Sequence, residues 1–157
     1  MNVAHLLDRA KARAIMIATA ESCTAGMVAA ALTDIPGSSA VFERGFVTYT
    51  NAAKQQMLGV RAATLDAFGA VSEQVAQEMV DGALERSAAQ LCVSITGIAG
   101  PGGSEYKPEG RVCFGLAALG IPTTTQTVEF GARGRGAVRS AARDHALNLL
   151  NDALRRL

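Results

Sequence analysis

Apolar residues recur with helical and strand periods along most of the chain. In the first third, residues 2–12 carry the apolar spacing of one helix face, and the short apolar run at 14–20 is typical of a buried strand. Strong helix formers fill residues 25–32, and Ser22 or Thr24 stands where a side chain caps a helix. This part of the chain therefore predicts a helix, a strand, a polar loop and a second helix.

The middle of the chain repeats this alternation. The predicted elements are a strand at 41–50, a helix at 51–58, a helical turn at 64–68, a helix at 73–88 and a buried strand at 91–96. We expect Asn51 to cap the first of these helices and Gly59 to end it. Ser72 is expected to open the long helix at 73–88.

The last third contains one irregular segment, at residues 97–110, with five glycines and two prolines. Such a long segment without a regular pattern is more often functional than a plain connection. Two strands follow at 111–119 and 123–130, joined through Gly120 as an antiparallel hairpin, and a helix is expected at 134–157.

Helices that alternate with strands, together with one hairpin, predict an α/β fold. We expect a three-layer α/β/α sandwich whose mixed, mostly parallel sheet includes the antiparallel hairpin. A length of 157 residues suits a single domain spanning residues 1–157.

Composition narrows the functional classes. Hydrophobic residues make up 49% of the chain and charged residues 18%, and no apolar run reaches the roughly 20 residues of a membrane-spanning helix. The first residues lack the pattern of a signal peptide, so we expect a cytoplasmic protein with no membrane association. A net charge of +1 gives no general attraction to nucleic acid. Three cysteines without a paired spacing predict neither a disulfide framework nor a zinc site, and no metal is expected.

The polar loop between the first strand and the second helix is a candidate site. Ser22, Cys23 and Thr24 lie where helix amides can bind an anion, although the same side chains can simply cap the helix. Cys23 is a possible nucleophile, but a catalytic thiol normally needs a histidine base. His5 and His145 both fall on predicted helices and read as surface or packing residues, which disfavours Ser-His-Asp catalysis.

A lysine can replace histidine as the base when burial lowers its pKa. Lys54 follows directly on the strand end at Tyr49, where α/β proteins assemble their sites, although most lysines on short helices are simply solvated. Two serines remain as nucleophile candidates, Ser22 and Ser39, and spacing alone does not decide between them.

Two further features can bind an anionic group. Thr96, Gly97 and Gly100 open the glycine-rich segment, whose backbone amides can approach an oxyanion or a phosphate closely. Arg135 opens the last helix and can donate two parallel hydrogen bonds to a phosphate, although a solvated helical arginine is equally common.

Several motifs in fixed order resemble the CinA C-terminal domain family over essentially the whole chain. They are Ala-Glu-Ser-Cys-Thr-Ala-Gly at 20–26, the segment from Pro36 to Asn51 with Lys54, Gly-Ala-Val-Ser at 69–72 and Thr-Gly-Ile-Ala-Gly-Pro-Gly-Gly at 96–103. The family usually has glycine where this chain has Ala25.

The resemblance implies a Ser/Lys amidohydrolase with no cofactor. Carried onto matching positions, it implies Ser39 as the nucleophile, Lys54 as the general base and Tyr49 as a hydroxyl that assists proton transfer or orientation. It also implies a set of substrate-binding residues, Ser22, Cys23, Thr24, Thr96, Gly97, Gly100 and Arg135, with Arg135 on the phosphate. Ser22 remains the competing nucleophile.

The activity implied is that of a stand-alone nicotinamide-nucleotide amidohydrolase, which converts nicotinamide mononucleotide and water to nicotinate mononucleotide and ammonia. A homodimer is the family's expectation. The alternative is a non-catalytic nucleotide-binding or competence-associated module of the CinA type, which would bind without turnover.

Overall fold

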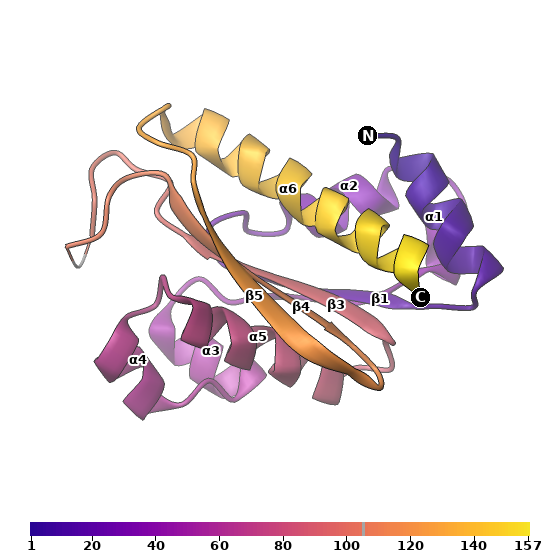
Figure 1. Cartoon of the computed structure of the whole chain (residues 1–157), viewed down its shortest axis with the longest axis horizontal. Helices are drawn as coiled ribbons and strands as arrows, with labels where there is room; N and C mark the ends of the chain where they lie inside the picture. The colour runs from indigo at the N-terminus through magenta and orange to yellow at the C-terminus, as the bar shows by residue number, and fades with distance from the viewer. Residues whose placement is uncertain (105) are drawn as a thin grey trace.

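A central sheet is covered by helices on both faces in the computed structural model, which describes residues 1–104 and 106–157 (Figure 1). The five strands are β1 (Ile17–Glu21), β2 (Phe42–Val47), β3 (Leu91–Gly97), β4 (Arg111–Ala118) and β5 (Ile121–Glu129). The helices on one face are α1 (Val3–Ala12), α2 (Met27–Thr33) and α6 (Arg135–Arg156). Those on the other are α3 (Asn51–Leu58), α4 (Ala62–Phe68) and α5 (Glu73–Glu85), and one 3-10 turn, Ser38–Ala40, precedes β2. The predicted three-layer α/β/α sandwich is confirmed.

The strand order is β2-β1-β3-β4-β5, and the sheet is evenly mixed. β1 pairs in parallel with β2 and with β3, whereas β3 with β4 and β4 with β5 are antiparallel. The mixed character and the hairpin were expected, but only half of the strand pairings are parallel. The polar loops after β1, β2 and β3 therefore lie together at the carboxyl ends of these strands, because parallel strands end on the same side of the sheet.

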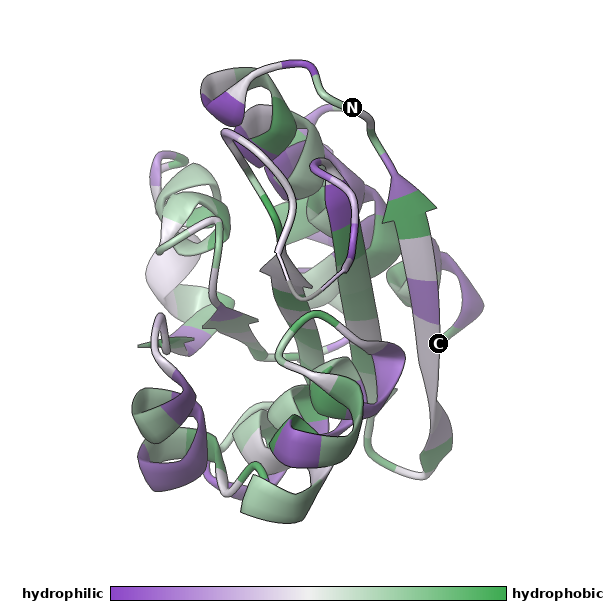
Figure 2. Ribbon diagram, turned by 90° about the vertical axis from the view of Figure 1, so that its left-hand side faces the viewer, coloured by the Kyte–Doolittle hydropathy of each residue, from purple (hydrophilic) through white to green (hydrophobic). Residues whose placement is uncertain are grey.

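Each face of the sheet has its own core. On the side of α1, α2 and α6, the buried residues of β3 are Leu91, Val93 and Ile95. On the side of α3, α4 and α5, the same strand contributes Cys92, as side chains alternate along a strand. Figure 2 shows the result, with largely hydrophobic central strands and alternating bands on the outer strand β5.

The boundaries shift where the backbone is unusual. β1 begins at Ile17 rather than at residue 14, because Ala14 lies in a left-handed turn (φ 53°) that ends α1. The hairpin turn is the pair Leu119 and Gly120, so β5 begins earlier than predicted and includes Pro122. Proline is tolerated there because β5 is an edge strand, which pairs with β4 on one side only. The predicted helix cap at Ser72 is confirmed, since its side chain accepts a hydrogen bond from Val75 N.

The position of α3 depends on a glycine in α5. A Cβ atom at Gly82 would lie 2.0 Å from the carbonyl oxygen of Leu58, the last residue of α3. The two helix backbones therefore touch where any side chain would separate them.

We predict that Gly82→Ala destabilises the protein by about 1–3 kcal/mol, as overpacking of a core does. Helix propensity alone predicts a gain of up to about 1 kcal/mol. Gly136→Ala is the matched control, because a Cβ at Gly136 in α6 would meet nothing within 4 Å. Urea unfolding measures both variants, and a Gly82→Ala protein as stable as the parent would show that the two helices are free to separate.

Candidate active site

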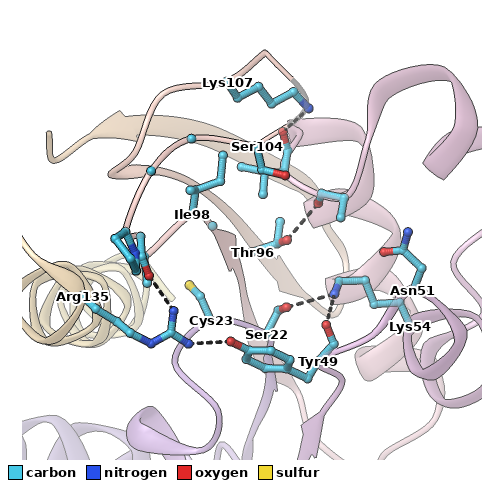
Figure 3. Close-up of a pocket in the computed structure, with 18 residues that line it drawn as sticks. Ser22, Cys23, Tyr49, Asn51, Lys54, Thr96, Ile98, Ser104, Lys107 and Arg135 are labelled. Carbon is cyan, nitrogen blue, oxygen red and sulfur yellow. Dashed lines mark hydrogen bonds between the residues drawn. The ribbon is translucent and has the colours of Figure 1, made fainter. Parts of the chain in front are cut away.

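A cavity of about 310 Å³ lies at the edge of the sheet where β1, β2 and β3 end. Most residues predicted for the site line it together: Ser22, Cys23, Tyr49, Lys54, Thr96, Gly97, Gly100 and Arg135. Figure 3 shows Ser22 and Lys54 pointing at each other, with Tyr49 and Arg135 beside them. Charged residues among the described lining are all cationic, namely Lys54, Lys107 and Arg135.

The centre of the cavity is a hydrogen bond between Lys54 and Ser22. Lys54 Nζ lies 2.9 Å from Ser22 Oγ, 3.0 Å from the carbonyl oxygen of Thr48 and 3.3 Å from that of Tyr49. Lys54 is only 1% exposed and Ser22 only 7%. A neutral amine has two hydrogens and one lone pair, so the two carbonyls can accept both hydrogens while Ser22 donates to the lone pair.

Burial changes the ionisation of Lys54. It lowers the pKa of the ammonium from 10.5 to about 8. The charged form loses its hydration in the interior, and the described residues that bond Nζ are uncharged. Lys54 is thus not the solvated lysine that its short helix permits, and near pH 7 roughly a tenth of it is neutral and able to accept a proton.

Local sequence brings Lys54 to this point. Thr50, not the predicted Asn51, caps α3, and its side chain accepts a hydrogen bond from Ala53 N at 3.0 Å. Lys54 and Leu58 are the buried residues of α3, one turn apart, and Gly59 ends the helix in a left-handed conformation as predicted. The lysine side chain therefore faces inward beside the end of β2.

Ser39 does not share the cavity. It is exposed in the 3-10 turn Ser38–Ala40 before β2, whereas Tyr49 and Lys54 follow β2. Six residues of strand at about 3.3 Å each put roughly 20 Å between the two ends. Within one chain Ser39 therefore lies away from Lys54, and the serine within hydrogen-bond reach of Lys54 is Ser22.

The polar loop carries a different set of roles from those expected. Thr24 is fully buried and does not line the cavity, so its side chain does not reach the space where a substrate would lie. Cys23 does line it, but burial raises the pKa of its thiol to about 11. The thiol stays protonated near neutral pH, which argues against Cys23 as the nucleophile.

Glu21 holds the start of α2 in place of the predicted Ser22 or Thr24 cap. Its fully buried carboxylate accepts hydrogen bonds from Val28 N at 3.0 Å and Ala29 N at 3.1 Å. These are amides that a helix cap normally satisfies. The anion expected at this helix start is thus supplied by the protein itself.

The backbone between Ser22 and α2 is left-handed at two successive residues. Ala25 has φ 45° and Gly26 has φ 96°, so α2 begins at Met27 rather than at residue 25. A residue with a Cβ in this region costs roughly 1–2 kcal/mol. The glycine usual in the family would avoid that cost at Ala25.

Arg135 joins two walls of the cavity. Its guanidinium donates to the carbonyl oxygen of Gly100 and to the hydroxyl of Tyr49, both at 2.7 Å. The hydroxyl of Tyr49 therefore faces Arg135, while its backbone carbonyl accepts from Lys54.

The glycine-rich segment forms the remaining wall. Thr96 Oγ donates to the carbonyl oxygen of Ala70 at 2.8 Å, which uses its only hydrogen and leaves it an acceptor toward the cavity. A Cβ at Gly97 would lie 2.7 Å from Val112, so this position has no room for a side chain. Lys107 fixes the segment by donating to the carbonyls of Phe68 and Val71.

The two histidines lie outside the cavity lining. His145 packs against Phe114, with ring centroids 4.5 Å apart, and its Nε2 lies 2.8 Å from Gln126 Oε1. His5 is exposed on α1. Both agree with the sequence expectation of surface and packing roles.

Sequence reasoning missed Glu21, Asn51 and Lys107. Glu21 belongs to the quoted loop motif and directly follows four other strand residues, so the alternation of β1 places it on the α2 side. Asn51 lines the cavity beside Lys54. No local signal identifies Lys107, whose partners are 36 and 39 residues away.

A metal-binding cluster and a membrane-spanning helix are both absent from residues 1–104 and 106–157. No group of three or more His, Cys, Asp or Glu side chains there is arranged to hold a metal ion. No helix in the same residues is long and apolar enough to cross a membrane.

Known proteins match this chain along its length. The family model of the CinA C-terminal domain matches residues 2–154. Nicotinamide-nucleotide amidohydrolase PncC of Escherichia coli strain K12 is 55% identical over 141 residues, which is 89% of this chain and 85% of that protein. A CinA-like protein of Chloroherpeton thalassium is 50% identical over 154 residues, or 96% of this chain. The chain spans only 36% of that CinA-like relative's length.

Solved structures agree with the fold. The competence/damage inducible protein CihA from Agrobacterium tumefaciens superimposes with a TM-score of 0.89 at 47% identity, covering 98% of this chain and 95% of that one. A CinA superfamily protein from Klebsiella pneumoniae 700603 gives a TM-score of 0.92 at 36% identity over the full length of both chains.

The lowered pKa of Lys54 makes a prediction about stability. The folded protein releases this proton near pH 8, whereas the unfolded chain holds it to about pH 10.4. Between these values the unfolded chain binds more protons, so the free energy of unfolding should rise with pH relative to Lys54→Met. The relative slope is at most about 1.4 kcal/mol per pH unit.

Urea unfolding of the two proteins between pH 7 and 10 measures this difference. Cys92 and Cys113 are present in both proteins and cancel in the comparison, and the Cys23 thiol, whose pKa burial raises to about 11 although Lys54 lowers it, stays largely protonated in the folded state over this range. A difference that stays constant over this range would mean that Lys54 ionises like a solvated lysine.

Proposed function

Since this chain belongs to the CinA C-terminal domain family, we propose that it is a nicotinamide-nucleotide amidohydrolase that uses Ser22 as nucleophile and Lys54 as general base. The reaction would convert nicotinamide mononucleotide and water to nicotinate mononucleotide and ammonia. The observation that carries the proposal is the buried hydrogen bond of 2.9 Å between Lys54 Nζ and Ser22 Oγ. The name of the E. coli relative supplies the substrate class.

The first half of the reaction follows from this pair. Neutral Lys54 accepts the proton of Ser22 as Oγ attacks the carboxamide carbon. The resulting ammonium of Lys54 then protonates the departing nitrogen, and ammonia leaves the nucleotide bound to Ser22 as a nicotinoyl ester. Backbone amides of the Ser22–Gly26 turn or of the glycine-rich segment stabilise the oxyanion in this proposal.

The second half repeats the chemistry with water. Lys54, neutral again after ammonia has left, accepts a proton from a water molecule, which attacks the ester carbonyl. The proton returns to Ser22 Oγ as the ester bond breaks, and the carboxylic acid that forms gives its own proton to ammonia or solvent and leaves as the carboxylate. One lysine therefore serves both steps without histidine or metal.

Thr96 supports recognition of an amide. Its hydroxyl hydrogen is held by Ala70, so toward the cavity Oγ offers only lone pairs. A carboxamide N–H₂ can donate to it, whereas the carboxylate of the product has no hydrogen to donate. The contact favours the substrate over the product at this position.

Arg135 is proposed as the phosphate ligand, with Tyr49 in an orienting role. The two side chains are joined by a hydrogen bond of 2.7 Å, and the exposed guanidinium stands at the start of α6. The Tyr49 hydroxyl thus supports Arg135 in this proposal rather than moving the serine proton. Ser22, Cys23, Gly97 and Gly100 complete the substrate contacts.

A binding module without turnover is the alternative. A binding module has no need to desolvate a lysine against a serine hydroxyl, and such strongly perturbed groups gather at catalytic sites. The homodimer, the cytoplasmic location, the single domain over residues 1–157 and the lack of contact with nucleic acid stay predictions.

Replacement of each candidate serine tests the nucleophile. Ser22→Ala should lower ammonia release from nicotinamide mononucleotide by at least about 1,000-fold, as loss of a nucleophile does. Ser39→Ala is the matched control and should stay within about 2-fold. Steady-state ammonia assays on both variants decide, and a Ser22→Ala enzyme with near-normal turnover would overturn the assignment. Binding of the nucleotide by the native protein without any ammonia would favour the binding module.

Removal of Arg135 tests the phosphate contact. Arg135→Ala should raise KM for nicotinamide mononucleotide about 10- to 100-fold, because a hydrogen bond to a charged group contributes roughly 1.5–3 kcal/mol. Nicotinamide riboside, which lacks the phosphate, should be a poor substrate that this change hardly affects. Kinetics with both substrates give the comparison, and an equal loss for the two would contradict a phosphate role.

A further inference from the structure

A second arginine of α6 reaches the loop that carries Ser22. Arg139 Nε donates a hydrogen bond of 3.0 Å to the carbonyl oxygen of Cys23, the residue directly after Ser22. Arg139 is half-buried and lies 116 residues along the chain from its partner. It stands four residues after Arg135, which is about 6 Å along the helix axis.

The loop has a physical need for such a contact. Ala25 and Gly26 are both left-handed, and a strained backbone persists only where its surroundings hold it. Glu21 holds one side of the loop through the first amides of α2. The contact with Arg139 holds the stretch next to Ser22 from the side of α6.

The carbonyl of Cys23 also fixes its neighbours. The peptide group is planar and trans, so an anchored carbonyl sets the direction of the Thr24 N–H on the opposite side. It equally restricts the rotation that would move Ser22 away from Lys54. An error of about 1 Å in the position of a nucleophile can cost on the order of 100-fold in rate.

We infer that Arg139 is a positioning residue, which anchors the Cys23 carbonyl and thereby keeps Ser22 within hydrogen-bond reach of Lys54. This inference rests on the proposed role of Ser22 as nucleophile. Arg135 and Arg139 lie on one helix but act on different things: Arg135 contacts the phosphate, and Arg139 holds the backbone of the nucleophile loop. Replacement of Arg135 should therefore change mainly KM, and replacement of Arg139 mainly kcat.

Four variants test the inference. Arg139→Met keeps an unbranched apolar stem without a donor, and Arg139→Lys keeps a donor that can reach the same carbonyl. Arg143→Ala is the matched control, since Arg143 lies one turn further along α6 and pairs with its neighbour Asp144. Arg135→Ala provides the contrast in substrate binding.

We expect Arg139→Met to lower kcat for nicotinamide mononucleotide roughly 10- to 100-fold with KM within about 3-fold. Arg139→Lys should recover most of kcat, and Arg143→Ala should match the parent. Arg135→Ala should instead raise KM. Thermal unfolding of each variant shows whether the substitution has damaged the whole structure. A general loss of structure would not be rescued by lysine, and it would not lower kcat alone.

A second readout separates this inference from the proposed function. A fluorophosphonate reagent labels an activated serine without needing the nucleotide, and mass spectrometry gives the rate at Ser22. Slower labelling in Arg139→Met than in the parent supports the anchor even if the parent releases no ammonia. Equal labelling rates with an unchanged kcat would overturn the anchor alone, and absence of labelling in the parent would overturn both the anchor and its premise.

Discussion

The desolvation of Lys54 is the constraint on which the site depends. A lysine in water holds its proton far too firmly to act as a base near neutral pH, and only removal of water brings its pKa to about 8. That removal requires α3 to lie flat against α5 and the end of β2 to supply two carbonyls. The chemistry of the proposed site therefore depends directly on the packing of the helical layer formed by α3, α4 and α5.

The layer of α1, α2 and α6 holds the Ser22 loop in position, whereas the proposed base, Lys54, comes from the other layer. A left-handed turn joins β1 to α2, and the carboxylate of Glu21 accepts hydrogen bonds from backbone amides in the first turn of α2. α6 reaches the same loop with Arg139 and two other segments with Arg135. The proposed base therefore comes from one face of the sheet, and the contacts that hold the Ser22 loop come from the other face.

Much of this arrangement was readable from sequence. Apolar periodicity predicted nearly every helix and strand, because both faces of the central strands are buried and the core residues keep their spacing. The errors at Ala14 and Leu119 arose where single residues adopt turn conformations that periodicity does not reveal. The motif resemblance identified the family, and eight of the ten predicted site residues line the cavity.

The choice of serine shows what spacing cannot decide and topology can. Ser39 is nearer to Lys54 in sequence, but it precedes β2 while Lys54 follows it. Ser22 follows β1, which is parallel to β2, so Ser22 and Lys54 both lie at the carboxyl ends of these strands. Lys107 was beyond prediction for another reason: its contacts are with distant backbone, which depends on the finished fold. Glu21, by contrast, contacts amides seven and eight residues away, on the face to which the alternation of β1 assigns it.

The cationic lining of the cavity has a consequence for the end of the proposed reaction. Hydrolysis turns a neutral carboxamide into a carboxylate, so the bound nucleotide gains one negative charge while the charged side chains described around it are all positive. In this proposal the cationic lining attracts the product more strongly than the substrate, in opposition to the Thr96 contact, which favours the amide. Departure of the product becomes the step most sensitive to ionic strength, because dissolved salt screens that attraction.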